Sequence, residues 1–214
     1  MRKTSLSNKY YLIFYIFFFV GIAGHFSDRY FDIMITLTPY ILLFMGVLVL
    51  IFTGVLRSKQ FAFWFVITYI FTLILEIIGV KTGMIFGEYS YGDVLGFKLF
   101  GVPLIIGFNW LFVIAGAYSV SCFISRNKYI IIFSAAILSV VFDILLEPIA
   151  VKLGYWEWHG GIIPFQNYAA WFIISASATA GLVYFNKNDL TINFKMFMHY
   201  FFSQIIFFLA LNFS

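Results

Sequence analysis

Residues 129–151 read YIIIFSAAILSVVFDILLEPIAV. A transmembrane helix needs about 20 predominantly apolar residues, and this segment reaches that length with two carboxylates, Asp143 and Glu147, as its only charged side chains. The two acids are four residues apart, so a helix presents both of them on one face. The segment therefore predicts a membrane-spanning helix that carries a pair of acids.

The same apolar pattern recurs on both sides of this segment. The predicted spans are residues 10–24, 33–56, 61–80, 100–124, 129–151, 165–185 and 194–213. Only 10% of the 214 residues are charged, whereas soluble domains carry roughly 25%. The sequence predicts an all-α fold, a polytopic membrane bundle of about seven transmembrane helices, with residues 1–214 as a single integral membrane domain. The first span is expected to remain as an uncleaved anchor, and a cleaved signal peptide is the alternative.

The distribution of Lys and Arg gives the bundle an orientation. Cytoplasmic loops carry an excess of these residues, and nine of the 13 lie on the side of the N-terminus. These nine are Arg2, Lys3, Lys9, Arg57, Lys59, Arg126, Lys128, Lys187 and Lys195, against Arg29, Lys81, Lys98 and Lys152 on the other side. The N-terminus is therefore predicted to be cytoplasmic and the C-terminus outside, in the inner (cytoplasmic) membrane of a bacterium.

The two longest predicted outer loops, residues 81–99 and 152–164, are rich in Gly, Tyr, Trp, Pro and charged residues. Function is often carried by loops. Most carboxylates also fall on or near the outer half, whereas Asp189 is predicted to be cytoplasmic. The outer ones are Asp28, Asp32, Glu76, Glu88, Asp93, Asp143, Glu147 and Glu157. The chemistry is therefore expected on the outer side.

An imperfect internal repeat links two parts of this outer region. Each half begins with a Glu and a Gly seven residues apart, at residues 76–83 and 147–154. Each continues with an aromatic-x-aromatic triplet, at residues 89–91 and 156–158. The repeat predicts two equivalent carboxylate-bearing helices around one pocket.

Glu76, Asp143 and Glu147 are the candidate catalytic residues. Carboxylates within a membrane are costly and normally face the bundle interior. Two acids one turn apart oppose each other's ionisation, so one of the pair is expected to hold a proton at neutral pH. A protonated carboxylic acid in a dry aromatic pocket can protonate an alkene. The alternative is an acid that is neutralised by Lys81 or Lys152, or that reaches the outer headgroups.

Aromatic and amide side chains near these acids are the candidate substrate-binding residues. They are Tyr89, Tyr91, Asn109, Trp110, Trp156, Trp158, Asn167 and Trp171. Aromatic faces stabilise cations, and each asparagine could hold a water or orient a carboxylate. The alternatives are an interfacial aromatic belt and hydrogen bonding between helices. The 30 Phe and 14 Tyr also fit an interior for a conjugated apolar molecule, although AT-rich coding bias would enrich the same residues.

Several classes of protein are disfavoured by what the sequence lacks. Neither a phosphate-binding loop nor a GxGxxG motif occurs. His25, His159 and His199 are scattered and Cys122 is the single cysteine, so no metal site is predicted. The last span has no Lys in its apolar run to bind retinal, and the dispersed basic residues fit membrane topology better than nucleic acid. We expect no cofactor, no metal and no nucleic-acid partner.

The ordered motifs of residues 76–171 resemble one known family. They are Glu76-x-x-Gly79-x-x-x-Gly83-x-x-Phe86-Gly87-x-Tyr89-x-Tyr91, Gly101-Val102-Pro103, Trp110, Asp143-x-x-x-Glu147-Pro148, Tyr155-Trp156-x-Trp158, Pro164, Asn167 and Trp171. This pattern is similar to the signature of the carotenoid biosynthesis membrane proteins. That family includes carotenoid 1,2-hydratases, of the γ-carotene 1',2'-hydratase and bisanhydrobacterioruberin hydratase types. The segment of residues 160–167 resembles a variant of a turn that reads Gly-Val-Pro, with a following Asn, in the family.

The resemblance implies a cofactor-independent hydro-lyase that adds water across the terminal 1,2 double bond of an acyclic ψ-end carotenoid. The Asp143/Glu147 pair would protonate C2 of the alkene, and aromatic faces would hold the tertiary cation at C1. Water would then add with Glu76 as base, and an exchange of roles among the acids is the alternative. The expected partners are the lipophilic carotenoid, membrane lipid and other carotenoid enzymes.

Two other functions are compatible with the same residues. A lycopene-type carotenoid cyclase would use the same acid and cation, but a neighbouring alkene would capture the cation. A non-enzymatic small membrane transporter or carotenoid-binding protein would use the intramembrane acids as an ion or proton site. The mass of the product separates a cyclase from a hydratase, and acid-to-amide variants separate either enzyme from a binding protein.

Overall fold

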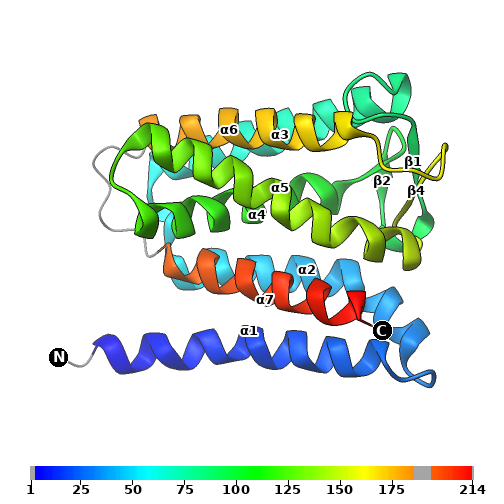
Figure 1. The fold of residues 1–214 in the computed structure, drawn as a ribbon. Coiled ribbons are helices and arrows are strands. Elements are labelled where there is room, and N and C mark those ends of the chain that lie inside the picture. Colours follow the sequence, from blue (N-terminus) through cyan, green and yellow to red (C-terminus); the bar gives the residue numbers. More distant parts are fainter. Residues whose placement is uncertain (1–2, 186–193, 214) are drawn as a thin grey trace.

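The computed structural model describes residues 3–185 and 194–213, and within these ranges the chain forms seven α-helices that run side by side (Figure 1). They are α1 (Lys3–His25), α2 (Phe31–Thr53), α3 (Lys59–Thr82), α4 (Leu104–Ile124), α5 (Lys128–Lys152), α6 (Phe165–Phe185) and α7 (Lys195–Asn212). The predicted all-α bundle is confirmed. Of the described helices, α2 to α6 are long and apolar enough to cross a membrane, and α1 contains a shorter apolar segment, Tyr11–His25. The chain is an integral membrane protein.

The arrangement of the helices places the two termini at opposite ends of the bundle, as an odd number of spans requires (Figure 1). Helix α1 lies along one side, and α2 and α7 separate it from the group formed by α3 to α6. Which end faces the cytoplasm stays a prediction. Of the basic residues on which that orientation depends, Arg2 and Lys187 lie outside the described ranges, and so does Asp189, the carboxylate predicted to be cytoplasmic.

Helix α1 begins at Lys3, seven residues before the predicted span. Two other predicted boundaries differ from the helices by three or four residues, and backbone geometry explains both. Helix α2 ends at Thr53 instead of residue 56, because Gly54 adopts a left-handed conformation (φ 65°) and caps it. Helix α4 begins at Leu104 instead of residue 100. Strands β2 (Lys98–Leu99) and β3 (Val102–Pro103) form a hairpin before it, and its two turn residues, Phe100 and Gly101, have φ values of 51° and 88°, as tight hairpin turns require.

A second pair of strands lies at the same end of the bundle as the C-terminus (Figure 1). Strands β1 (Tyr89–Tyr91) and β4 (Trp156–Trp158) are antiparallel, with Tyr89 opposite Trp158 and Tyr91 opposite Trp156. A short 3-10 helix, η2 (Asp93–Leu95), follows β1, and another, η1 (Val55–Arg57), precedes α3. The two aromatic-x-aromatic triplets of the internal repeat are therefore paired with each other.

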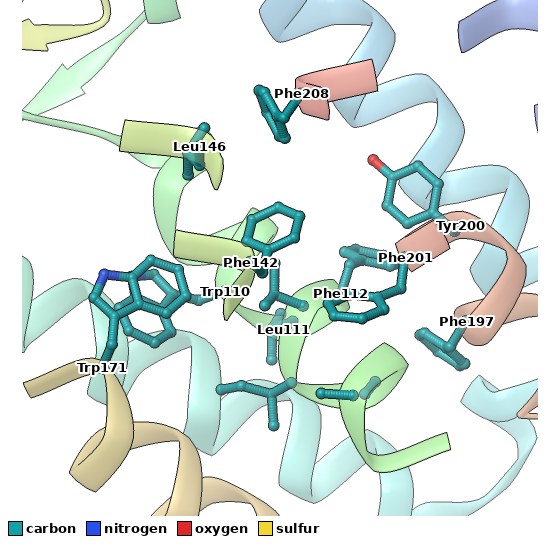
Figure 2. Close-up of a cluster of buried hydrophobic side chains, with 14 of the residues drawn as sticks. Trp110, Leu111, Phe112, Phe142, Leu146, Trp171, Phe197, Tyr200, Phe201 and Phe208 are labelled. Carbon is teal, nitrogen blue, oxygen red and sulfur yellow. The ribbon is translucent and has the colours of Figure 1, made fainter. Parts of the chain in front are cut away.

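Large aromatic side chains fill the interior between α4, α5 and α7 (Figure 2). Phe142 of α5 stacks on Phe201 of α7, with ring centroids 5.6 Å apart, and its edge meets Phe208. On the other side Phe142 contacts Trp171 of α6. This packing holds α5, the helix with two acids, against two neighbouring helices, α6 and α7.

The β1–β4 pair depends on a close approach of two glycines. The Gly92 amide donates a hydrogen bond to the Tyr155 carbonyl (2.9 Å), and a Cβ atom on Gly92 would lie 2.1 Å from the carbonyl oxygen of Gly154. Gly92→Ala is therefore expected to lower the free energy of unfolding by about 1–3 kcal/mol, the usual cost of overpacking. The measurement is the unfolding midpoint in detergent. Gly160→Ala is the matched control, since none of the described atoms lies within 4 Å of its Cβ position; equal midpoints for the two variants would contradict the prediction.

Candidate active site

The β1–β4 pair presents its aromatic side chains to the interior of the bundle. Side chains alternate between the two faces of a strand, so Ser90 and Glu157 point the other way from the four aromatic residues that flank them. Glu157 is exposed, whereas Trp156, Trp158 and Tyr89 are buried. The two strands thus form a lid of aromatic rings over the ends of α3 and α5.

Glu76 is held by three donors and is only 5% exposed. The Tyr89 and Tyr91 hydroxyls donate to its Oε2 atom at 2.5 and 2.8 Å, and Trp110 Nε1 of α4 donates to Oε1 at 2.8 Å. The chain reaches this arrangement because α3 ends at Thr82 and the following loop folds back, with Phe86 packed against Gly79. Strand β1 is thereby placed beside the helix that carries Glu76.

Glu147 has a corresponding set of three donors. Trp156 Nε1 and Trp158 Nε1 donate to its Oε2 atom at 3.0 and 2.8 Å, and Asn167 Nδ2 of α6 donates to Oε1 at 3.2 Å. Each glutamate therefore binds the aromatic triplet of its own half of the repeat, together with one donor from the next helix.

Asp143 differs from both glutamates in its hydrogen bonding. It is fully buried, and Asn167 Nδ2 donates to its Oδ2 atom at 2.7 Å. Its Oδ1 atom receives no hydrogen bond from any described residue. Asp143 is thus the one acid of the three with a carboxyl oxygen that none of the described residues hydrogen-bonds.

The hydroxyls of Tyr89 and Tyr91 stay protonated. Burial, and secondly the nearby Glu76 carboxylate, raise the pKa of both phenols above the ordinary value. A neutral phenol donates a hydrogen bond to the Glu76 carboxylate, and the negative charge stays on Glu76. Both tyrosines therefore act as fixed donors.

Trp110 and Trp171 stack on each other beside the acids, with ring centroids 3.8 Å apart and planes at 23° (Figure 2). Each is the seventh residue after the proline that precedes its helix, Pro103 or Pro164. This equal spacing extends the internal repeat into α4 and α6. It is a signal in the sequence that would have predicted the two rings as structural equivalents.

Two neighbouring cavities share part of their walls in this region. The smaller, of about 40 Å³, lies among the three acids, and a buried water needs at least about 10–15 Å³. The larger, of about 200 Å³, is almost wholly apolar and lies between α1, α2, α4 and α7. Ile106, Asn109, Leu146 and Trp156 line both cavities.

The structure brings all the residues singled out in the sequence to one place. The smaller cavity is lined by Glu76, Tyr89, Tyr91, Asn109, Trp110, Asp143, Glu147, Trp156, Asn167 and Trp171. Trp158 joins them through its hydrogen bond to Glu147. The wall also contains Phe86, which belongs to the quoted family motif but was not named as a site residue. Ile106 and Leu146 complete the wall, and they were not predicted because apolar residues look alike in the pocket and in the lipid-facing surface.

The alternatives considered for these residues fit the structure less well. Glu76 is bound by neutral donors, and the ammonium group of Lys81 lies over the ring of Phe100 instead, 4.7 Å from its centroid. The four tryptophans near the acids are buried and do not form an exposed interfacial belt. Asn167 joins α6 to α5, but it does so by binding the two acids. Asn109 Oδ1 is buried without a partner among the described residues.

The fold and the pocket define a class of protein: a helical membrane protein in which three carboxylates are enclosed by aromatic donors. The chain belongs to the carotenoid biosynthesis protein family, whose model matches residues 9–214. It is similar to the bisanhydrobacterioruberin hydratase of Haloarcula japonica, with 30% identity over 114 residues. The match covers 49% of this chain and 38% of the relative's length. No solved structure is significantly similar to the chain.

Proposed function

We propose that the chain is a carotenoid hydratase that adds water across the terminal 1,2 double bond of an acyclic ψ-end carotenoid. The observation that carries the proposal is the Oδ1 atom of Asp143, which lies in the wall of the smaller cavity and receives no hydrogen bond from the part of the chain that the structure describes. One cavity suits a water and the other an apolar chain. Family membership and the similarity to a hydratase support the same reaction.

Asp143 is the member of the Asp143/Glu147 pair that suits the role of proton donor. Hydrogen bonds from donors favour the ionised form of a carboxyl group. Glu76 and Glu147 each receive three such bonds, whereas Asp143 receives one. A proton shared by the pair therefore resides on Asp143, and the negative Glu147 opposes its loss until an alkene is present.

The proposed reaction is a proton transfer followed by addition of water. Asp143 gives its proton to C2, the double-bond electrons form the new C–H bond, and C1 becomes a tertiary cation. The rings of Trp110 and Trp171 line the smaller cavity together with the acids, and their π electrons stabilise that charge. A water held at Asn109 adds to C1 and loses a proton to Glu76. Return of this proton to Asp143 through cavity water restores the site, and no cofactor or metal is needed.

A cyclase would need the same acid and aromatic rings but no water. Room for a water beside Asp143 and the unpartnered oxygen of Asn109 therefore favours hydration. Both groups can hydrogen-bond that water. The mass of the product distinguishes a hydratase from a cyclase.

The test is expression of the full chain in a host that accumulates lycopene or γ-carotene, followed by mass spectrometry of the pigments. Hydration adds the mass of one water for each end that reacts, and cyclisation gives an isomer of the substrate. Pigment recovered unchanged, with well-expressed protein, would refute both enzyme activities and leave a binding or transport role.

The partners, location and domain organisation follow from the same proposal. The substrate is a lipophilic carotenoid in membrane lipid, other carotenoid enzymes supply it, and residues 1–214 act as a single membrane domain. The site faces the outer side of a bacterial inner membrane. A phosphatase fused to the C-terminus should be active outside the cytoplasm; activity of only a cytoplasmic reporter at that position would reject this orientation.

A further inference from the structure

The larger cavity reaches the lipid-facing surface of the bundle. Three residues in its wall, Phe17 and Val20 of α1 and Leu37 of α2, are 38%, 55% and 39% exposed. The other side of the wall includes Ile106, Asn109, Leu146 and Trp156, which also border the acids. The cavity therefore extends from the surface between α1 and α2 to the wall that it shares with the candidate active site.

Contacts between α1 and α2 bound this opening at both ends. Toward the N-terminal end of α1, the rings of Phe17 and Phe44 meet with centroids 5.9 Å apart. Toward the loop that joins the helices, Gly24 packs so closely on Met34 that a Cβ atom would lie 2.5 Å from Met34 Cγ. Between Phe17 and Gly24 the axis of α1 rises roughly 10 Å. The opening, which we call the α1–α2 window, is thus a limited gap and not a general separation of the two helices.

The cavity is too small for a whole carotenoid. Its volume of about 200 Å³ is below the roughly 300–1,000 Å³ that encloses a drug-sized ligand, and a carotenoid is longer than such a ligand. Part of any bound polyene must therefore remain outside the cavity. Its apolar surface is stable in lipid and costly to expose to water.

We infer that the α1–α2 window admits the carotenoid sideways from the bilayer, with the reacting end first and the rest of the polyene left in lipid. This inference rests on the proposed function for the identity of the ligand. Helix α1 suits the role of a side wall, because it lies at the edge of the bundle and packs on α2 and α7 (Figure 1). The reactive end then passes Ile106 and Leu146 to reach Asp143.

The test is a reversible closure of the window in the full chain. Val20→Cys and Leu37→Cys are combined with Cys122→Ser, which removes the single native cysteine. A bifunctional thiosulfonate reagent then bridges the two new cysteines through disulfides. The measurement is the rate at which purified protein takes up lycopene from liposomes, read from the absorbance of protein-bound pigment. Bridging is expected to slow uptake about tenfold, and a reductant that releases the bridge is expected to restore it.

The matched control carries Phe19→Cys and Ile33→Cys in the same background. These exposed residues lie on the same two helices, and within the described chain they are outside the cavity wall. The reagent is expected to leave their uptake unchanged. Equal uptake before and after bridging of residues 20 and 37, or a loss that the reductant does not reverse, would overturn the inference. Gated uptake without any gain of water in the pigment would instead uphold the window and refute the hydratase activity.

Discussion

Asp143→Asn is expected to lower the rate of carotenoid hydration by about 10²–10⁴-fold, the usual contribution of a general acid. Asparagine has no acidic proton to give to C2 of the alkene. Its side-chain oxygen can still accept the hydrogen bond of Asn167, so the packing around the pocket is retained. The measurement is hydrated pigment per amount of protein in a lycopene-producing host. Retention of bound pigment by the purified variant would separate lost chemistry from lost binding.

Asp93→Asn is the matched control for loss of a carboxylate at the same end of the bundle. Asp93 is exposed and pairs with Lys98 at 2.7 Å, which lowers the pKa of its carboxyl group through that hydrogen bond and charge. Its removal should leave hydration unchanged. Hydration by well-expressed Asp143→Asn at the rate of the unmodified chain would reject Asp143 as the acid.

Glu76→Leu is expected to have the largest effect on stability. It would leave the hydroxyls of Tyr89 and Tyr91 and the Trp110 N–H buried without their acceptor. Each unpaired buried group costs about 1–3 kcal/mol, so we expect a loss of about 3–6 kcal/mol, since the two hydroxyls can bond to each other. Unfolding by a denaturing detergent, followed by tryptophan fluorescence, measures this loss.

Glu76→Gln tests the chemistry of the same position with a milder change. The amide oxygen can accept from one side, and the tyrosine hydroxyls can rotate to accept from the amide nitrogen. This variant should fold nearly as stably as the unmodified chain but add water far more slowly.

Ile74→Ala, on the exposed face of α3, is the control for a generic change in that helix. If Glu76→Leu unfolds no more easily than this control, the three hydrogen bonds do not stabilise the fold.

The sequence predicted the helices and the inward position of the three acids well, because both have strong local signals. Long apolar runs require helices in a membrane, and the four-residue spacing of Asp143 and Glu147 puts both on one face. The strands were not predicted. Each is two or three residues long, and the pairing of β1 with β4 joins segments far apart in the chain. Such pairings are tertiary contacts that no local periodicity encodes.

The apolar residues of the cavity walls could not be predicted for a different reason. In a soluble protein, hydropathy separates the interior from the surface. In a membrane both the lipid-facing surface and an apolar cavity are lined by the same residue types. Ile106 and Leu146 therefore resemble Ile74 and Ile33 in sequence, although the first two border the acids and the other two are exposed.

The ladder between β1 and β4 has a mechanical consequence for the pocket. Transmembrane helices tilt when the bilayer becomes thicker or thinner, and such tilting would change a spacing set by helix packing alone. Here the aromatic side chains that donate hydrogen bonds to Glu76 and Glu147 belong to two strands that are hydrogen-bonded to each other. Because the two strands are paired, a movement of one carboxylate is transmitted through the strands to the other. The distance between them should therefore be the same in membranes of different thickness.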